Sequence, residues 1–167
     1  MLAGCAPTLD WRSVAVPDTS LVAELPCRPG RFQRDVVVAG TPLKLFMLSC
    51  EAGGVTYGVA TADVGDVRRI EPVLQALVVG AEAALRTRAA VEPLSVAGAT
   101  PFVANVSARL RGVRPDGQAV EQTLRVFGRG TRVFEASAIG AALPAAAGKP
   151  FEDGLQFVAD PAPPSAR

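Results

Sequence analysis

Apolar and polar residues alternate along several short segments of the chain, which is the pattern of β-strands with one buried face. The segment from Val103 to Gly112 shows it most clearly, with Val106, Ala108 and Leu110 on one face. Other segments are short apolar runs bounded by turn residues. The predicted strands are Trp11–Val16, Leu21–Leu25, Arg31–Val38, Leu43–Cys50, Val55–Thr61, Leu94–Val96, Val103–Gly112, Gln118–Phe127 and Arg132–Ile139.

The apolar period changes to that of a helix between Ile70 and Arg88, where apolar residues recur three and four positions apart. Pro72 fits the first turn of this helix, where its missing N–H costs little. A second, shorter helix is predicted for Pro150–Val158, after a loop or weak helix over Ala141–Lys149. Gly154 weakens that helix, so docking onto the rest of the domain must stabilise it.

Strands outnumber helices in this scheme, and glycine-rich turns join many of them as hairpins. The paired Gly53 and Gly54 suit a tight hairpin loop, and the last four strands are expected to form a meander. The fold class is therefore α/β of the α+β type, with a mostly antiparallel sheet. We expect both faces of the Val55–Thr61 strand to be covered. One domain is predicted over residues 11–158, between a tether at 1–10 and a disordered proline-rich tail at 159–167.

Composition and charge exclude several function classes. The 167 residues are 49% hydrophobic and 20% charged, with a formal net charge of +1, so nucleic acid is not an expected partner. The longest apolar region, Val73 to Leu85, contains Gln75 and Glu82, and no stretch is long enough to span a bilayer.

The chain contains no histidine, which removes nucleophile–histidine catalysis and the commonest metal ligand. Three dispersed cysteines cannot form a zinc site. Asp63 and Asp66 flank the start of the main helix, where capping explains them better than catalysis. We therefore expect no enzyme, no cofactor and no metal.

The residues Leu2-Ala3-Gly4-Cys5 resemble the lipobox of bacterial lipoproteins. That resemblance implies a lipid on the Cys5 thiol, a membrane anchor and a periplasmic location, and Ala6 after the cysteine favours the outer membrane. Only Met1 precedes Leu2, whereas the family has a basic and an apolar region there. A start codon placed too far downstream, or a sequence reduced to its mature part, would explain this; the alternative is a chance match.

Cys27 and Cys50 form the natural pair once Cys5 is set aside. A disulfide between them closes a loop that stabilises the fold by roughly 3 kcal/mol in the chain-entropy model. Such a bond persists only outside the cytoplasm. The alternative is two buried thiols that act as small hydrophobes.

The order of elements resembles the PsbP-like (Mog-type) family over about residues 11–158. Three patterns carry the resemblance: Leu25-Pro26 at the end of an early strand, the strand from Arg132 to Gly140, and the closing segment from Phe151 to Phe157, where Gly154 replaces the usual serine. The resemblance implies an α/β/α sandwich and a role in binding or assembly rather than catalysis.

A set of arginines on the second run of strands is the one candidate binding patch. An anionic partner, such as an acidic protein or a lipopolysaccharide phosphate, would suit it if these side chains cluster. The competing interpretation is a solvated face balanced by Glu121 and Glu135. The residues of the predicted patch are Arg109, Arg111, Arg125, Arg129 and Arg132.

Together these features predict a non-enzymatic periplasmic lipoprotein that binds or helps assemble another envelope component, with an envelope protein as the expected partner. The alternative is a cytoplasmic chaperone or adaptor of a secretion system, which would have a wide apolar groove and free Cys27 and Cys50 thiols. An enzyme that uses only carboxylates is the third hypothesis. The sequence predicts no oligomeric state.

Overall fold

The alternating segments pair into two antiparallel sheets. The structure is a computed structural model that describes residues 9–159. The large sheet has seven strands in the order β3-β4-β5-β9-β8-β7-β6, and the small sheet has three in the order β1-β2-β10. The strands are β1 (Arg12–Ala15), β2 (Leu21–Leu25), β3 (Gly30–Val38), β4 (Thr41–Ala52), β5 (Val55–Asp63), β6 (Ala90–Pro93), β7 (Val106–Val113), β8 (Ala119–Arg129), β9 (Arg132–Gly140) and β10 (Gln156–Phe157).

Two-residue turns close the hairpins of the first half of the large sheet. Ala39 and Gly40 join β3 to β4 with φ of 49° and 71°, and Gly53 and Gly54 join β4 to β5 with φ of 60° and 75°. Positive φ at both central residues matches the right-handed twist of the flanking strands. The predicted Gly53–Gly54 hairpin is confirmed, and β6 to β9 form the predicted meander.

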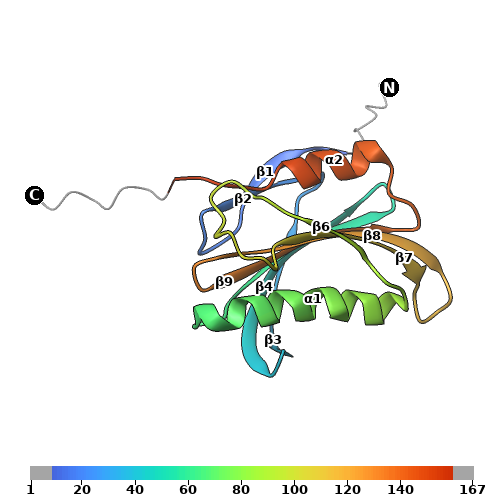
Figure 1. Cartoon of the computed structure of the whole chain (residues 1–167). Coiled ribbons are helices and arrows are strands. Elements are labelled where there is room, and N and C mark those ends of the chain that lie inside the picture. Colours follow the sequence, from blue (N-terminus) through green and yellow to red (C-terminus); the bar gives the residue numbers. More distant parts are fainter. Residues whose placement is uncertain (1–8, 160–167) are drawn as a thin grey trace, which may run out of the picture.

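One face of the large sheet is covered by α1 (Ile70–Leu85), which follows the short helix η1 (Val67–Arg69). Figure 1 shows α1 running beneath the sheet, with the β3 end of the sheet curling past it. Buried residues Ile70, Val73 and Leu74 pack with Leu110 and Leu124 of the sheet in an aliphatic core. We call this face of the sheet the helix side.

The carboxyl end of α1 sits directly on the backbone of β7. A Cβ atom at Gly112 would lie 2.1 Å from the carbonyl oxygen of Leu85, which ends the helix. Only glycine permits this approach, because the obstacle is backbone rather than a flexible side chain.

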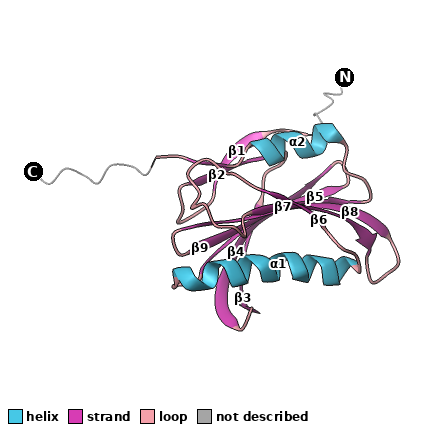
Figure 2. Ribbon diagram, viewed as in Figure 1, coloured by secondary structure: helices cyan, strands magenta, loops and turns pink. Residues whose placement is uncertain are grey.

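The opposite face is covered by the small sheet and by α2 (Ala145–Asp153), which together we call the cap layer. Figure 2 shows both lying across the sheet from α1. The core between the sheet and the cap layer is rich in aromatic rings. Phe127 and Phe134 stack with centroids 5.3 Å apart, and Tyr57 meets Phe151 edge to face at 5.6 Å.

The expected α/β/α sandwich is wrong. About half of the described residues are in strands, and the two α-helices among them leave the fold β-rich. The cap layer is largely a second antiparallel sheet, because β1, β2 and β10 pair with one another. The mostly antiparallel pairing of the large sheet agrees with the prediction.

The predicted helix over Pro150–Val158 is also wrong. The helix begins earlier, at Ala145, and ends at Asp153, after which Gln156 and Phe157 extend and pair with Val22 and Leu21. The apolar spacing of the segment is misleading here, because Phe151 is buried from the helix and Leu155 from the extended chain that follows.

The predicted strand Leu94–Val96 is replaced by β6 at Ala90–Pro93, and the next strand starts at Val106 rather than Val103. Both faces of β5 are covered as predicted, with Tyr57 and Val59 in one core and Ala62 in the other. Residues 1–8 and 160–167 lie outside the described residues, so the tether and the disordered tail stay predictions.

Candidate functional site

The two cysteines predicted to pair are joined by a disulfide. Their sulfur atoms lie 2.05 Å apart and their Cα atoms 6.0 Å apart. Cys27 follows β2 of the cap layer, and Cys50 lies on β4 opposite Tyr57 of β5. The bond therefore ties the cap layer covalently to the large sheet. Cys5, the predicted lipidation site, lies outside the described residues.

All five arginines of the predicted patch project from the cap-layer face of the sheet, but two of them are engaged beneath the cap layer. Arg125 Nη2 lies 3.3 Å from Glu152 Oε2 of α2, and Arg125 also donates to the Glu152 carbonyl oxygen. The guanidinium of Arg129 lies 4.7 Å from the ring centroid of Phe157 and donates to the Ser20 hydroxyl. These two side chains hold the cap layer in place.

Arg109 and Arg111 line a polar cleft of about 340 Å³ between the sheet and α2. Arg111 pairs with Glu121 at 3.1 Å. The cleft is balanced in charge, because its three basic side chains face three acidic ones. The basic residues are Arg109, Arg111 and Lys149, and the acidic residues are Glu121, Glu152 and Asp153.

Arg132 lies at the far end of the same face, opposite Arg129 and next to Asp63 in the strand register. The five arginines thus do not gather at one open surface. Glu135 does not balance them, because it projects to the helix side of the sheet, into a groove lined by α1 residues. The interpretation that placed Glu135 on the arginine face is wrong.

A second hollow, which sequence reasoning missed, opens between α1 and the β3–β4 hairpin. We call it the helix-side groove. Its cavity volume is about 140 Å³, similar to the apolar cavities of about 150 Å³ that accept a benzene-sized group. Its walls are mainly aliphatic. The lining residues are Arg34, Val36, Val38, Leu43, Leu45, Met47, Ala60, Thr61, Ala62, Val73, Leu77, Val133 and Glu135.

Glu135 brings the only carboxylate to this groove. It lies on the central strand β9, between Ala60 of β5 and Val126 of β8 in the register. Burial raises the pKa of Glu135, and the positive charge of Arg34 acts in the opposite direction. Among the described residues its carboxylate has no hydrogen bond and no ion pair within 4.0 Å, so it remains available to a hydrogen-bond donor or a cation.

The acidic residues near the start of α1 have the structural roles expected of them. Asp66 accepts from the backbone N–H of Arg68 at 2.9 Å and caps η1, and Asp63 accepts from the N–H of Gly65 at 2.9 Å. Hydrogen bonds from Arg68 lower the pKa of Asp66 to about 2. These carboxylates are occupied by turn and cap contacts.

The groove can bind an apolar group and hold one polar atom beside Glu135. It has no second carboxylate that could share acid–base work with the first. Within residues 9–159, no cluster of three or more histidine, cysteine, aspartate or glutamate residues could hold a metal ion.

The chain matches no known family model, no curated protein and no solved structure. No helix among residues 9–159 has the length and apolar character needed to cross a membrane.

Proposed function

We propose that this chain is a non-enzymatic binding protein of the bacterial envelope, tethered by a lipid on Cys5, that uses the helix-side groove to bind another envelope component. The groove is the observation that carries the binding role. It combines aliphatic walls with one carboxylate that has no partner among the described residues, which is the usual composition of a binding pocket.

The disulfide and the lipobox support the envelope as its location. Thiols in the cytosol are kept reduced, so a Cys27–Cys50 bond fits a periplasmic protein. The sequence Leu2-Ala3-Gly4-Cys5 supports a lipid anchor, with Ala6 favouring the outer membrane. The rival hypothesis, a cytoplasmic chaperone or adaptor, accounts for an apolar groove but requires free thiols.

The location can be tested with the gene and its own upstream codons. Cells grown with a labelled fatty acid should yield labelled protein, and Cys5→Ser should remove the label. Alkylation before and after reduction should reveal two additional reactive thiols after reduction, from Cys27 and Cys50. An unlabelled protein with both thiols free in cells would favour the cytoplasmic rival.

The binding role can be tested by placing a photo-crosslinking amino acid in the groove in living cells. Leu77 lies on the groove wall, and exposed Gln118 in the β7–β8 turn is the matched control. The probe at position 77 should yield a discrete crosslinked product that is absent at position 118. Equal crosslinking at the two positions would contradict the groove as a binding surface.

A further inference from the structure

The large sheet ends in a long, regular edge strand, β3. This strand pairs with β4 on one side and is the outermost strand of the sheet. Its register runs without a bulge from Gly30 opposite Ser49 to Val38 opposite Thr41. The other edge, β6, has four residues and ends at Pro93. Short edges, bulges and proline commonly protect an edge against strand addition, and β3 has none of them; its protection is limited to charged side chains such as Arg31 and Arg34.

The backbone groups of β3 that point to the open side follow from the hairpin geometry. Val38 and Thr41 flank a two-residue turn and so form a hydrogen-bonded pair. Along an antiparallel pair of strands, hydrogen-bonded pairs alternate with pairs that form no hydrogen bonds to each other. Gln33 and Asp35 therefore direct their N–H and C=O groups away from β4. Pro42 lies opposite Val37, in a pair that forms no hydrogen bonds between the two strands, and its lack of an N–H fits that position.

Two exposed apolar side chains flank this edge. Phe32 is 54% exposed on the helix side, and Val37 is 71% exposed on the opposite face. A strand with one apolar face would cover Phe32 on the helix side and place its other side chains beside Arg31 and Val37 on the opposite face. The edge thus offers main-chain hydrogen bonds and apolar contacts together.

The charge of the edge is basic. Arg28, Arg31 and Arg34 form no ion pair with any described residue, whereas Asp35 lies opposite Lys44 on β4. Antiparallel pairing with a second copy centred on Arg34 would place two guanidinium groups opposite each other, whereas pairing centred on Gln33 would place Arg31 opposite Asp35, so the sedimentation test below addresses this occupant. Acidic residues in the added strand would complement the edge.

We propose that β3 accepts an extended segment of another protein, with alternating apolar and acidic residues, as an eighth strand of the large sheet. The inference rests on the proposed binding function and names the chemistry of its partner. Main-chain pairing supplies affinity in this mode of recognition, and the flanking side chains supply specificity.

The test uses the purified, oxidised protein and a fluorescent peptide, Thr-Val-Glu-Val-Thr-Val-Glu-Val-Thr, followed by fluorescence anisotropy. Gln33→Pro removes an outward N–H and blocks the edge, and Gln33→Ala keeps the N–H. Binding should weaken at least tenfold in Gln33→Pro and stay within twofold of wild type in Gln33→Ala. Equal binding by the proline variant would overturn the proposal.

N-methylated peptides provide a second test that leaves the protein unchanged. Neighbouring residues of a strand direct their N–H groups to opposite sides, so one pattern of methyl groups faces β3 and the other faces solvent. One methylation pattern should abolish binding and the other should be tolerated. If both patterns bind equally, the peptide does not pair as a strand.

Charge reversal tests the predicted chemistry of the partner. Arg31→Glu should weaken the acidic peptide about threefold to tenfold and favour a peptide with lysine in place of glutamate, an effect that salt should reduce. Sedimentation of the peptide-free protein addresses the other occupant. A dimer that Gln33→Pro dissociates, together with no peptide binding, would assign the edge to a second copy.

These results are independent of the groove experiment. Crosslinking at Leu77 without peptide binding at β3 would retain the proposed function and reject strand addition. Peptide binding that Gln33→Pro abolishes, without crosslinking at Leu77, would move the binding surface from the groove to the edge.

Discussion

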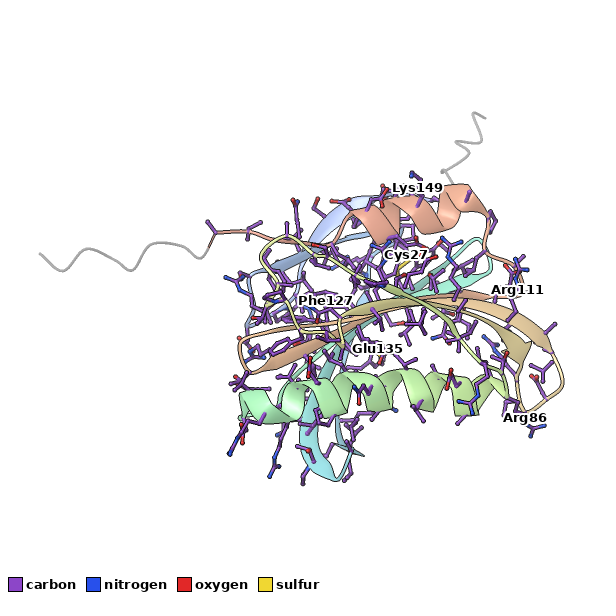
Figure 3. The ribbon with its side chains drawn as sticks, viewed as in Figure 1. Cys27, Arg86, Arg111, Phe127, Glu135 and Lys149 are labelled. Carbon is purple, nitrogen blue, oxygen red and sulfur yellow. A yellow bond between two sulfur atoms is a disulfide. The ribbon has the colours of Figure 1, made fainter. Side chains whose placement is uncertain are left out.

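The two faces of the large sheet are packed in different ways. Toward the cap layer the core is aromatic, with Tyr57, Phe127, Phe134 and Phe151 almost wholly buried, and both a disulfide and the Arg125–Glu152 pair close it. Toward α1 the core is aliphatic and leaves the groove that holds Glu135. Figure 3 shows Phe127 and Glu135 on opposite sides of the same sheet.

The comparison indicates which side of the large sheet contributes most to the stability of the domain. Aromatic rings bury large apolar areas and fill the space between the large sheet and the cap layer. The cap side therefore supplies rigidity. A single helix cannot cover a seven-stranded sheet, and α1 contacts β7, β8 and β9 and, less extensively, β3. The uncovered half of the helix side is therefore where the groove and the open edge occur.

The largest predicted difference comes from truncating one side chain on each face. Phe127→Ala should reduce the free energy of unfolding by about 3–5 kcal/mol, because it empties a closed core. Leu77→Ala should cost only about 1–2 kcal/mol, because this half-buried side chain borders an existing cavity. Urea unfolding measures both. Similar losses in the two variants would show that the faces are equally well packed.

Opening the disulfide should cost roughly 3 kcal/mol, since the 23-residue separation closes a loop of ordinary length. The double variant Cys27→Ala/Cys50→Ala isolates this effect from thiol chemistry. Its urea midpoint should match that of the wild-type protein in reductant. A variant as stable as the oxidised wild type would mean that the cap layer needs no covalent tie.

The Arg125–Glu152 pair is the next largest contributor. Glu152→Gln should cost about 1–3 kcal/mol, because it leaves Arg125, which is 18% exposed, without its counter-charge. Lys149→Gln is the matched control on the same helix, since the Lys149–Asp153 pair is 79% and 62% exposed and should contribute at most about 0.5 kcal/mol. Thermal unfolding of both variants at equal pH tests this order.

The smallest predicted effect is a gain in stability rather than a loss. Burial raises the folded-state pKa of Glu135 above its unfolded value, so the folded chain binds the proton more tightly, and stability falls as pH rises through the interval between the two pKa values. Glu135→Gln should therefore stabilise the protein at pH 7 and lose that advantage in acid, below the unfolded pKa. Glu51→Gln, at an exposed position near the end of β4, is the control. Destabilisation at pH 7 would instead reveal a stabilising partner of the carboxylate.

Most of the large sheet could be predicted because alternation along a strand is a local property. The segments around Val106 to Leu110 and Phe134 to Ala138 carry it plainly, and the glycine turns mark the hairpins. The end of the domain could not be predicted in this way. There Gln156 and Phe157 are positioned by pairing with β2, more than 130 residues away in the chain, and Gly154 is the local signal of the break in the helix.

The groove escaped prediction for a related reason. Alternation along β9 points the Glu135 side chain to the face opposite those of Phe134 and Ala136, and this could be predicted from the sequence. The register of β8 against β9 was not, and it is this register that sets Arg125 beside Ala136 rather than beside Glu135. The disulfide could be predicted because three cysteines, with Cys5 in a segment that resembles a lipobox, leave a single pair.

The position of the disulfide also determines how the domain carries mechanical load. A pull on the amino end enters through β1 and β2 and reaches Cys27, where the sulfur bridge passes it to Cys50 on β4, the second strand from the edge of the large sheet. The chain between these cysteines, which includes all of β3, is bypassed by the force. If the molecule were held by the Cys5 lipid that we propose, tension on that tether would leave β3 relaxed.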